Sequence, residues 1–112
     1  MNSGIYHVKF SSSNQSFGQG LAIFKDGCIN GGDPGYLYLG TYDTTSEGVS
    51  ANLKIKRWNP AMQSVFGPIT EFDLVLKGSM STDQTSFNVT GSSPQIRGSS
   101  ITISGDRISE AV

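Results

Sequence analysis

Short runs in which apolar and polar residues alternate dominate this chain. Near the N-terminus, Tyr6, Val8 and Phe10 are separated by single polar residues. Alternation with a period of two is typical of a β-strand that buries one face. The same alternation recurs over residues 49–57 and 72–77. We predict that the apolar positions of all three segments face one core.

Turn residues separate these runs and predict how the strands pair. The run 17–24 is followed by Asp26-Gly27, a dipeptide that tolerates the positive φ angles of a tight hairpin turn. We therefore expect this run to pair with a strand that begins at Cys28. The polar segment 43–48 is predicted to be a hairpin loop, and Gly105 to Ile108 a turn into a final short strand.

The spacing of the turns predicts the fold class. Turns recur about every 8–12 residues and delimit about seven or eight short strands, the rhythm of a small antiparallel sandwich or barrel. We favour an all-β, closed eight-stranded barrel, because closure leaves no sheet edge exposed. One short helix is predicted between Asn59, a potential N-cap, and Gly67, with Pro60 in its first turn.

Composition supports a single β domain and argues against several functions. Of 112 residues, 14 are Gly and 17 are Ser, which disfavours long helices. The length predicts one domain spanning residues 1–112. A net charge of -1 argues against nucleic-acid binding, which needs a basic excess. With neither a signal peptide nor a long apolar run, we expect a cytoplasmic protein without a membrane span.

Candidate chemistry is sparse. The chain has one Cys, Cys28, and one His, His7, which permits no internal disulfide and no ordinary four-ligand zinc site. Cys28 is expected to be a buried structural thiol, and His7 to be exposed or at an interface. Because no nucleophile, base and metal occur together, we expect no catalytic residues, no metal and no cofactor.

The aromatic residues allow two interpretations. Tyr36, Tyr38 and Tyr42 share one face of a predicted strand, and Trp58 follows the next strand. They could fill the core or form a dimer interface, since interfaces are rich in Tyr and Trp. Alternatively, they could line a cavity for an apolar or amphipathic ligand, because an eight-stranded barrel is either just filled or holds one small ligand.

Two polar features remain open on the sequence alone. Arg57 lies on the same face as apolar residues and needs a partner if it is buried. The candidates are Asp33, Glu71 or the head group of a ligand, and exposure at the strand end is the simpler explanation. The turn 31–33, Gly-Gly-Asp, is interpreted as a loop whose Asp side chain binds nearby backbone amides. A binding loop at the mouth of a barrel is the alternative.

A series of short motifs follows one another over the first two thirds of the chain. They are Gly4-Ile5-Tyr6, Phe10, Gly18-x-Gly20, Lys25-x-Gly27, Ile29 with Gly31-Gly32-Asp33, Tyr38-x-Gly40 and Arg57-Trp58-Asn59. In this order and at these spacings they resemble the GrlR family of negative regulators of type III secretion. The resemblance runs from Gly4 to about Leu76, and we see no match of individual residues beyond it.

The resemblance implies a lipocalin-like barrel that is usually a homodimer and acts without catalysis. It also implies a protein partner, a transcriptional activator of the secretion regulon, which the regulator binds and blocks. In the family the contact lies in a run of acidic residues just after the Tyr-x-Gly strand. The matching loop here is 43–48, in which only Asp43 and Glu47 are acidic.

The implied homodimer would join through the outer face of the barrel, where a two-fold axis brings one patch onto itself. We expect large side chains at outward positions to form that patch, and Tyr36, Tyr38 and Val75 are the candidates. Arg57 and Trp58 are further candidates for the interface or for a ligand cavity.

Overall fold

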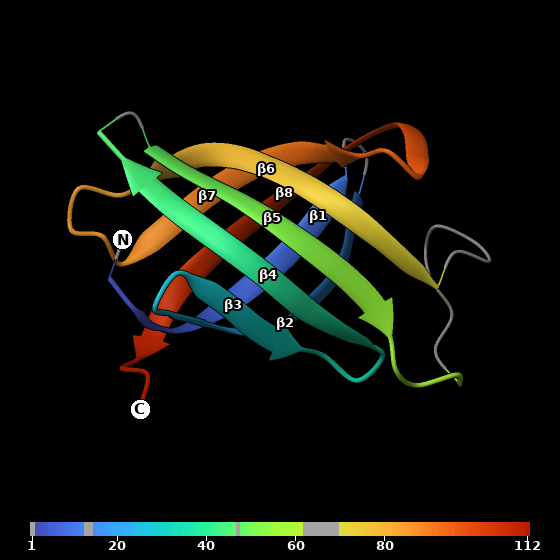
Figure 1. Cartoon of the computed structure of the whole chain (residues 1–112), viewed down its shortest axis with the longest axis horizontal. Coiled ribbons are helices and arrows are strands. Elements are labelled where there is room, and N and C mark those ends of the chain that lie inside the picture. The colour runs from blue at the N-terminus through green and yellow to red at the C-terminus, as the bar shows by residue number, and fades with distance from the viewer. Residues whose placement is uncertain (1, 13–14, 47, 62–69) are drawn as a thin grey trace.

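The structure is a computed structural model. It describes residues 2–12, 15–46, 48–61 and 70–112, apart from the side chains of residues 15–17 and 96–99. Eight antiparallel strands follow one another around a closed barrel, so that each strand pairs with its neighbours in sequence and β8 closes on β1 (Figure 1). The strands are β1 (Gly4–Ser12), β2 (Gln15–Lys25), β3 (Cys28–Gly32), β4 (Tyr36–Thr45), β5 (Gly48–Arg57), β6 (Glu71–Met80), β7 (Ser86–Ser93) and β8 (Ile96–Ser109). The predicted all-β barrel is confirmed.

The hairpin between β2 and β3 has the predicted turn. Asp26 and Gly27 both have positive φ angles, 54° and 78°, and Lys25 pairs with Cys28 across them. Two successive positive φ angles match the right-handed twist of the flanking strands. The short loop aligns β2 with β3 residue by residue.

The connection between β4 and β5 is shorter than predicted. Strand β4 continues to Thr45, which pairs with Gly48, so most of segment 43–48 is strand rather than loop. Threonine suits a pleated strand because its branched Cβ packs well there. The polar character of this segment reflects an exposed strand end.

Strand β8 is also longer than predicted. The turn expected at Gly105 does not exist, because β8 is continuous from Ile96 to Ser109. Gly105 faces Phe87 of β7, and a Cβ atom at this position would lie 2.3 Å from the Phe87 ring. The glycine therefore makes room for an aromatic ring and does not mark a turn.

The predicted helix falls largely on residues 62–69, which lie outside the described part of the chain. At its predicted start, the Asn59 side-chain oxygen accepts a hydrogen bond of 3.1 Å from the backbone N–H of Ala61. The described residues contain no helix.

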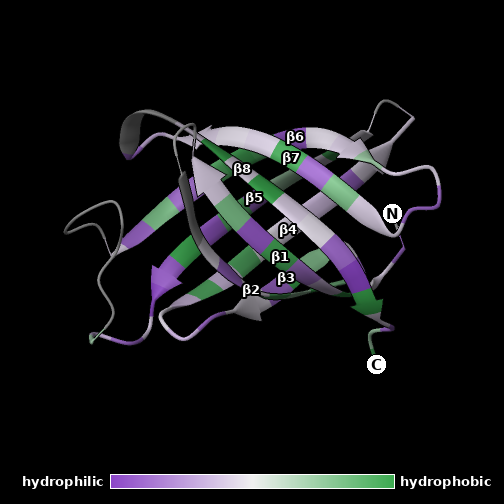
Figure 2. Ribbon diagram, turned by 180° about the vertical axis from the view of Figure 1, so that it is seen from behind, coloured by the Kyte–Doolittle hydropathy of each residue, from purple (hydrophilic) through white to green (hydrophobic). Residues whose placement is uncertain are grey.

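Alternate residues of every strand form one core, and Figure 2 shows the resulting bands of hydrophobic and hydrophilic residues along the strands. Tyr6, Phe24 and Phe87 pack together at one end, with ring centroids 5.1–5.5 Å apart. Aromatic pairs at such distances stabilise a core beyond the area they bury. Core residues from the predicted alternating segments include Val8, Phe10, Val49, Ala51, Leu53, Ile55, Phe72, Leu74 and Leu76.

Candidate functional site

The described inward side chains occupy most of the barrel interior that they line. The space that remains among the inward side chains has a volume of about 20 Å³ and is lined by apolar atoms. A cavity of that size holds about one water molecule, whereas a ligand pocket occupies several hundred Å³. The described side chains that line this space therefore leave too little room for a ligand, and the alternative of a ligand cavity that also involves residues 62–69, outside the described part of the chain, stays a prediction.

An open hollow of about 360 Å³ lies at the ends of β6, β7 and β8. Its lining is a mixture of polar and apolar residues, among them Met80, Phe87, Asn88 and Asp106. It is a shallow surface feature outside the core. The described residues also contain no group of three or more His, Cys, Asp or Glu that could hold a metal ion.

Asp33 organises the turn between β3 and β4. Its Oδ1 accepts hydrogen bonds of 2.8 Å from the backbone N–H groups of Gly35 and Tyr36, and its Oδ2 accepts one from the Tyr38 hydroxyl. The pKa of Tyr38 is raised, first because the phenol is buried and then because it donates to the Asp33 carboxylate. The structural interpretation of the Gly-Gly-Asp turn is confirmed.

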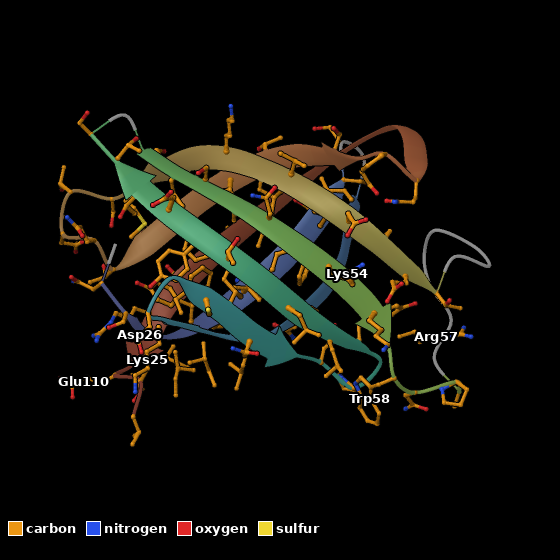
Figure 3. All side chains as sticks on the ribbon, in the orientation of Figure 1. Lys25, Asp26, Lys54, Arg57, Trp58 and Glu110 are labelled. Carbon is orange, nitrogen blue, oxygen red and sulfur yellow. The ribbon has the colours of Figure 1, made fainter. Side chains whose placement is uncertain are left out.

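The segment after β5 braces the same turn. The Trp58 indole N–H donates to the backbone oxygen of Asp33 at 3.0 Å, and the Asn59 side-chain amide donates to the Pro34 oxygen at 3.0 Å. Trp58 is otherwise exposed at the end of the barrel (Figure 3). Motif residues separated by 25 positions in the sequence thus hold one another in place. Their role is structural, which leaves the outward side chains as candidates for function.

The predicted outward position of Tyr36 and Tyr38 is wrong. Tyr38 is 2% exposed inside the barrel, and Tyr36 and Tyr42 pack against the core from the same face of β4. The Tyr36 hydroxyl is buried and has no hydrogen-bond partner among the described residues. Neither tyrosine presents its side chain on the outer face of the barrel.

The other predicted site residues lie at separate places. Val75 is half exposed on the outer face of β6. Arg57 is partly buried at the end of β5, where Figure 3 shows its side chain at the rim of the barrel, and its pairing with Asp33 or Glu71 stays a prediction. Asp43 is exposed on β4, while residue 47 lies outside the described part.

His7 and Cys28 both lie on the outside. The His7 ring nitrogen Nε2 is 2.9 Å from the Gln19 side-chain oxygen. Cys28 is exposed, so the prediction of a buried thiol is wrong. Side chains alternate between the two faces of a strand. Because Ile29 points into the core, its neighbour Cys28 points outward.

Four large apolar side chains point outward from β2 and β4, and we call them the β2–β4 face. Leu21, Ile23, Leu37 and Leu39 are each between 37% and 48% exposed. Single exposed apolar side chains are ordinary on a protein surface, but a contiguous group marks an interaction site. The sequence carried a signal for it, since the run 36–42 is apolar or aromatic on both of its faces.

The register of the strands brings these four side chains together. Between them lies β3, which contributes only a small or polar residue to each row. The two rows are Ile23–Asn30–Leu39 and Leu21–Gly32–Leu37. The large outward side chains of β2 and β4 therefore lie on either side of β3, whose outward residues in these rows are Asn30 and Gly32.

Lysines border this face on β5. Lys56 pairs with Leu37 and Lys54 with Leu39 in the register of β4 and β5. The Lys54 ammonium lies 3.6 Å from the Asp73 carboxylate of β6, with both side chains about half exposed. The nearest positive charges to the leucines of β4 thus come from one neighbouring strand.

A comparison with protein families identifies the family of the chain. The model of the family described as the type III secretion system (T3SS) negative regulator GrlR matches residues 1–111. The match reaches well past Leu76, so the resemblance extends over more of the chain than the short motifs indicated. No curated protein matches the chain.

Proposed function

The chain belongs to the GrlR family of negative regulators of type III secretion, and we propose that it represses a secretion regulon by binding a protein partner. The partner we propose is a transcriptional activator of that regulon. The mechanism is sequestration without catalysis, and its place is the cytoplasm, where a transcriptional activator works.

The observation that carries this proposal is the contrast between the small space among the described inward side chains and an apolar group on the outside. The space among the inward side chains is only about 20 Å³, while four large apolar side chains are exposed together outside. When a partner covers apolar area that was exposed to water, the free energy falls by about 25 cal/mol for each Å². Contact with another protein is thus better supported than storage of a small molecule.

Two finer features are part of the proposal. The first is a homodimer, for which Val75 remains a candidate contact because it is exposed on β6. The second is a contribution of Asp43 to partner binding, which its exposed position near the tip of the β4–β5 hairpin supports. Asp43 and Glu47 here take the place of a longer acidic run, so we expect their contribution to be modest.

A reporter assay tests the proposal. The chain is expressed beside a fluorescent reporter under a promoter that depends on a type III secretion activator, and we expect the signal to fall. Leu74→Ala, which opens the core, is the control for loss of folded protein. An unchanged reporter signal with a folded and abundant wild type would contradict the proposal.

Sedimentation of the wild type and of Val75→Asp tests the dimer at micromolar concentration. We expect a dimeric wild type and a shift of the variant toward monomer. A monomeric wild type would remove the dimer from the proposal but leave repression to be tested by the reporter.

A further inference from the structure

We infer that the Asp26-Gly27 turn between β2 and β3 is a site of spontaneous covalent modification, at which the aspartate isomerises to isoaspartate. The inference goes beyond the proposed function and does not depend on it. Three observations carry it: the backbone of the turn, the free N–H group of Gly27, and the contrast with Asn30-Gly31, a second sequence of the same kind that lies inside a strand.

The reaction needs only these two residues and water. The Gly27 backbone nitrogen attacks the side-chain Cγ of Asp26 in its protonated form, a new C–N bond forms, the C–OH bond breaks, and one water molecule leaves with the amide proton. Water then adds to the backbone carbonyl carbon of Asp26 in the resulting succinimide ring, and the bond from that carbon to the Gly27 nitrogen breaks. The main chain now runs through the side chain of Asp26, whose backbone carbonyl has become a free carboxylate.

The turn exposes both reacting groups. Asp26 is exposed and Gly27 partly so, and Figure 3 shows Lys25 and Asp26 at the end of the barrel where β3 begins. The φ angle of Asp26 is 54°, in the left-handed region that residues other than glycine adopt infrequently. A Cβ atom added to Gly27 would meet no other atom within 4 Å. The space beside Gly27 is therefore open, and glycine has no side chain of its own to hinder the attack.

The N–H group of Gly27 is free to react. Lys25 pairs with Cys28 across the turn, and the Gly27 carbonyl oxygen accepts a hydrogen bond of 3.0 Å from the Tyr42 backbone N–H. Among the described residues, no acceptor receives the N–H of Gly27 itself. The attack on Asp26 thus costs this nitrogen no hydrogen bond.

Asn30-Gly31 is the other place in the sequence where Asn or Asp precedes Gly. It reacts by the same route with loss of ammonia, and in an unstructured chain at neutral pH it reacts faster than Asp-Gly, because a carboxylate is a poor electrophile. Here, however, Gly31 pairs with Ala22 of β2 and with Tyr38 of β4. A Cβ atom on Gly31 would lie 2.2 Å from a backbone oxygen of β2, so the strands are in close contact there. Attack on Asn30 requires that β3 first separates from a neighbouring strand.

Folding should therefore reverse the order in which the two sites react. In the unfolded chain Asn30 reacts first, because its side chain is the better electrophile. In the folded chain Asp26 reacts first, because only its turn leaves the following nitrogen free. If sequence alone set the rates, both states would show the same order, so the reversal is the signature of the fold.

Isomerisation changes the hairpin that contains the site. Isoaspartate adds one carbon atom to the main chain between Lys25 and Cys28, which removes the two-residue loop with two positive φ angles. That loop sets the register of β2 and β3, which runs from the pair Lys25–Cys28 to the pair Leu21–Gly32. We therefore expect the modified protein to unfold at a lower concentration of denaturant than the unmodified protein.

Incubation of the purified protein tests the inference. One sample is kept warm and folded in neutral buffer, and a second is kept in the same buffer with enough guanidinium chloride to unfold it. Samples taken over several weeks are digested, and electron-transfer fragmentation, which gives distinct ions for isoaspartate, locates the modified residue. An isoaspartyl carboxyl methyltransferase, supplied with S-adenosylmethionine, measures the amount of isoaspartate per chain. Circular dichroism confirms that each sample is in the intended state.

We expect the folded wild type to form isoaspartate at Asp26 about tenfold or more faster than at Asn30, because opening a paired strand adds to the barrier at Asn30. In guanidinium chloride the order should be the opposite. Asp26→Gly leaves Gly-Gly, which suits the same turn but has no carboxyl group, so the folded-state signal should be lost. Asp26→Asn also suits the turn and should react faster than the wild type. The matched control is Asn30→Ser, which should leave the folded-state signal within about twofold.

Other outcomes overturn the inference. Isoaspartate that forms mainly at Asn30 in the folded protein would show that pairing of β3 does not protect that site. Isoaspartate that forms at Asp26 in guanidinium chloride but not in the folded protein would show that the closed turn prevents the reaction. A folded-state signal that Asp26→Gly leaves unchanged would place the modification elsewhere in the chain.

Discussion

The outer surfaces of β2–β4 and of β6–β8 cover the same kind of core but differ in character. Leucine and isoleucine stand outward on β2 and β4. On β7 and β8 most of the described outward positions are polar, and Thr90 and Thr102 face each other across the two strands with hydroxyl oxygens 3.2 Å apart. Val75 on β6 and Ile108 near the end of β8 are the exceptions.

The difference between the two outer faces shows which apolar side chains pack in the core and which do not. Inward residues on both sides are equally apolar, because both sides share one core. The largely polar outer face of β7 and β8 shows that strands of this barrel pair without a row of apolar groups outside. The apolar exterior of β2–β4 is therefore not required for folding, and contact with a partner is the physical reason we give for it.

The largest expected effect tests whether the two sides share one core. Ile29→Ala on β3 and Leu74→Ala on β6 each empty a position that is 1% exposed. Each should lower the free energy of unfolding by about 2–5 kcal/mol, the cost of a large-to-small change in a core. Urea unfolding measures both. A cost below about 1 kcal/mol for one variant alone would show that its side of the core is loosely packed.

The next effect concerns the support beneath the β2–β4 face. Tyr38→Phe removes the donor to Asp33 and should cost about 1–3 kcal/mol, because the partly buried carboxylate loses a charge-assisted hydrogen bond. The Trp58 indole, which binds the Asp33 backbone oxygen, should report the change through a shift in its fluorescence. Tyr42→Phe is the control, since it keeps the Asp33 interactions. Equal losses in both variants would contradict a special role for Tyr38.

The same tyrosine predicts a dependence on alkaline pH. Burial raises the pKa of both Tyr38 and Tyr6 above the ordinary value of 10.0. A raised pKa means that folding favours the neutral phenol, so this part of the stability is complete below pH 10 and is lost as the pH rises above it. Tyr38→Phe should show a smaller loss between neutral and alkaline pH than the wild type. Unfolding curves across that range measure the difference.

Exchanging the character of the two outer faces should change association more than stability. Leu37→Thr with Leu39→Thr makes β4 resemble β8, and we expect the free energy of unfolding to change by less than about 1 kcal/mol. Binding of a dye that reports exposed apolar surface should fall. Thr90→Leu with Thr102→Leu should have the opposite effect on the dye. A dye signal that none of these four substitutions changes would contradict the difference in apolar character between the two outer faces.

The smallest effect is expected at the ion pair beside the face. Lys54→Ala removes a contact of 3.6 Å between two half-exposed side chains and should cost less than about 1 kcal/mol. Added salt should shrink the difference further. A larger cost that persists in high salt would indicate that Lys54 acts through packing of its aliphatic stem.

Local patterns in the sequence were sufficient for much of the fold. The alternation in 6–10, 49–57 and 72–77 predicted which side chains are buried, and Asp26-Gly27 predicted the turn between β2 and β3. The turn predicted at Gly105 was wrong, because the sequence does not distinguish a glycine that makes room for an aromatic ring from a glycine that forms a turn. Only the position of Phe87 distinguishes the two.

The candidate site was less predictable than the fold. Alternation divides the run 36–42 into two faces, but both carry apolar or aromatic residues, so the pattern did not identify the inward face and the predicted outward position of Tyr36 and Tyr38 was wrong. The structure places Tyr38 inside because its hydroxyl reaches Asp33 at the barrel end, and Leu37 and Leu39 consequently face outward.

The sequence by itself determined that this chain forms an all-β barrel, where most strands lie and which family it belongs to, because the patterns that indicate them are local in the chain. The tertiary structure decided that the described inward side chains leave only a small space among them and that apolar side chains of β2 and β4 lie on either side of β3. Closure of a barrel and the register of its strands set both outcomes. A shift of one residue in that register would have turned the same side chains to the opposite face.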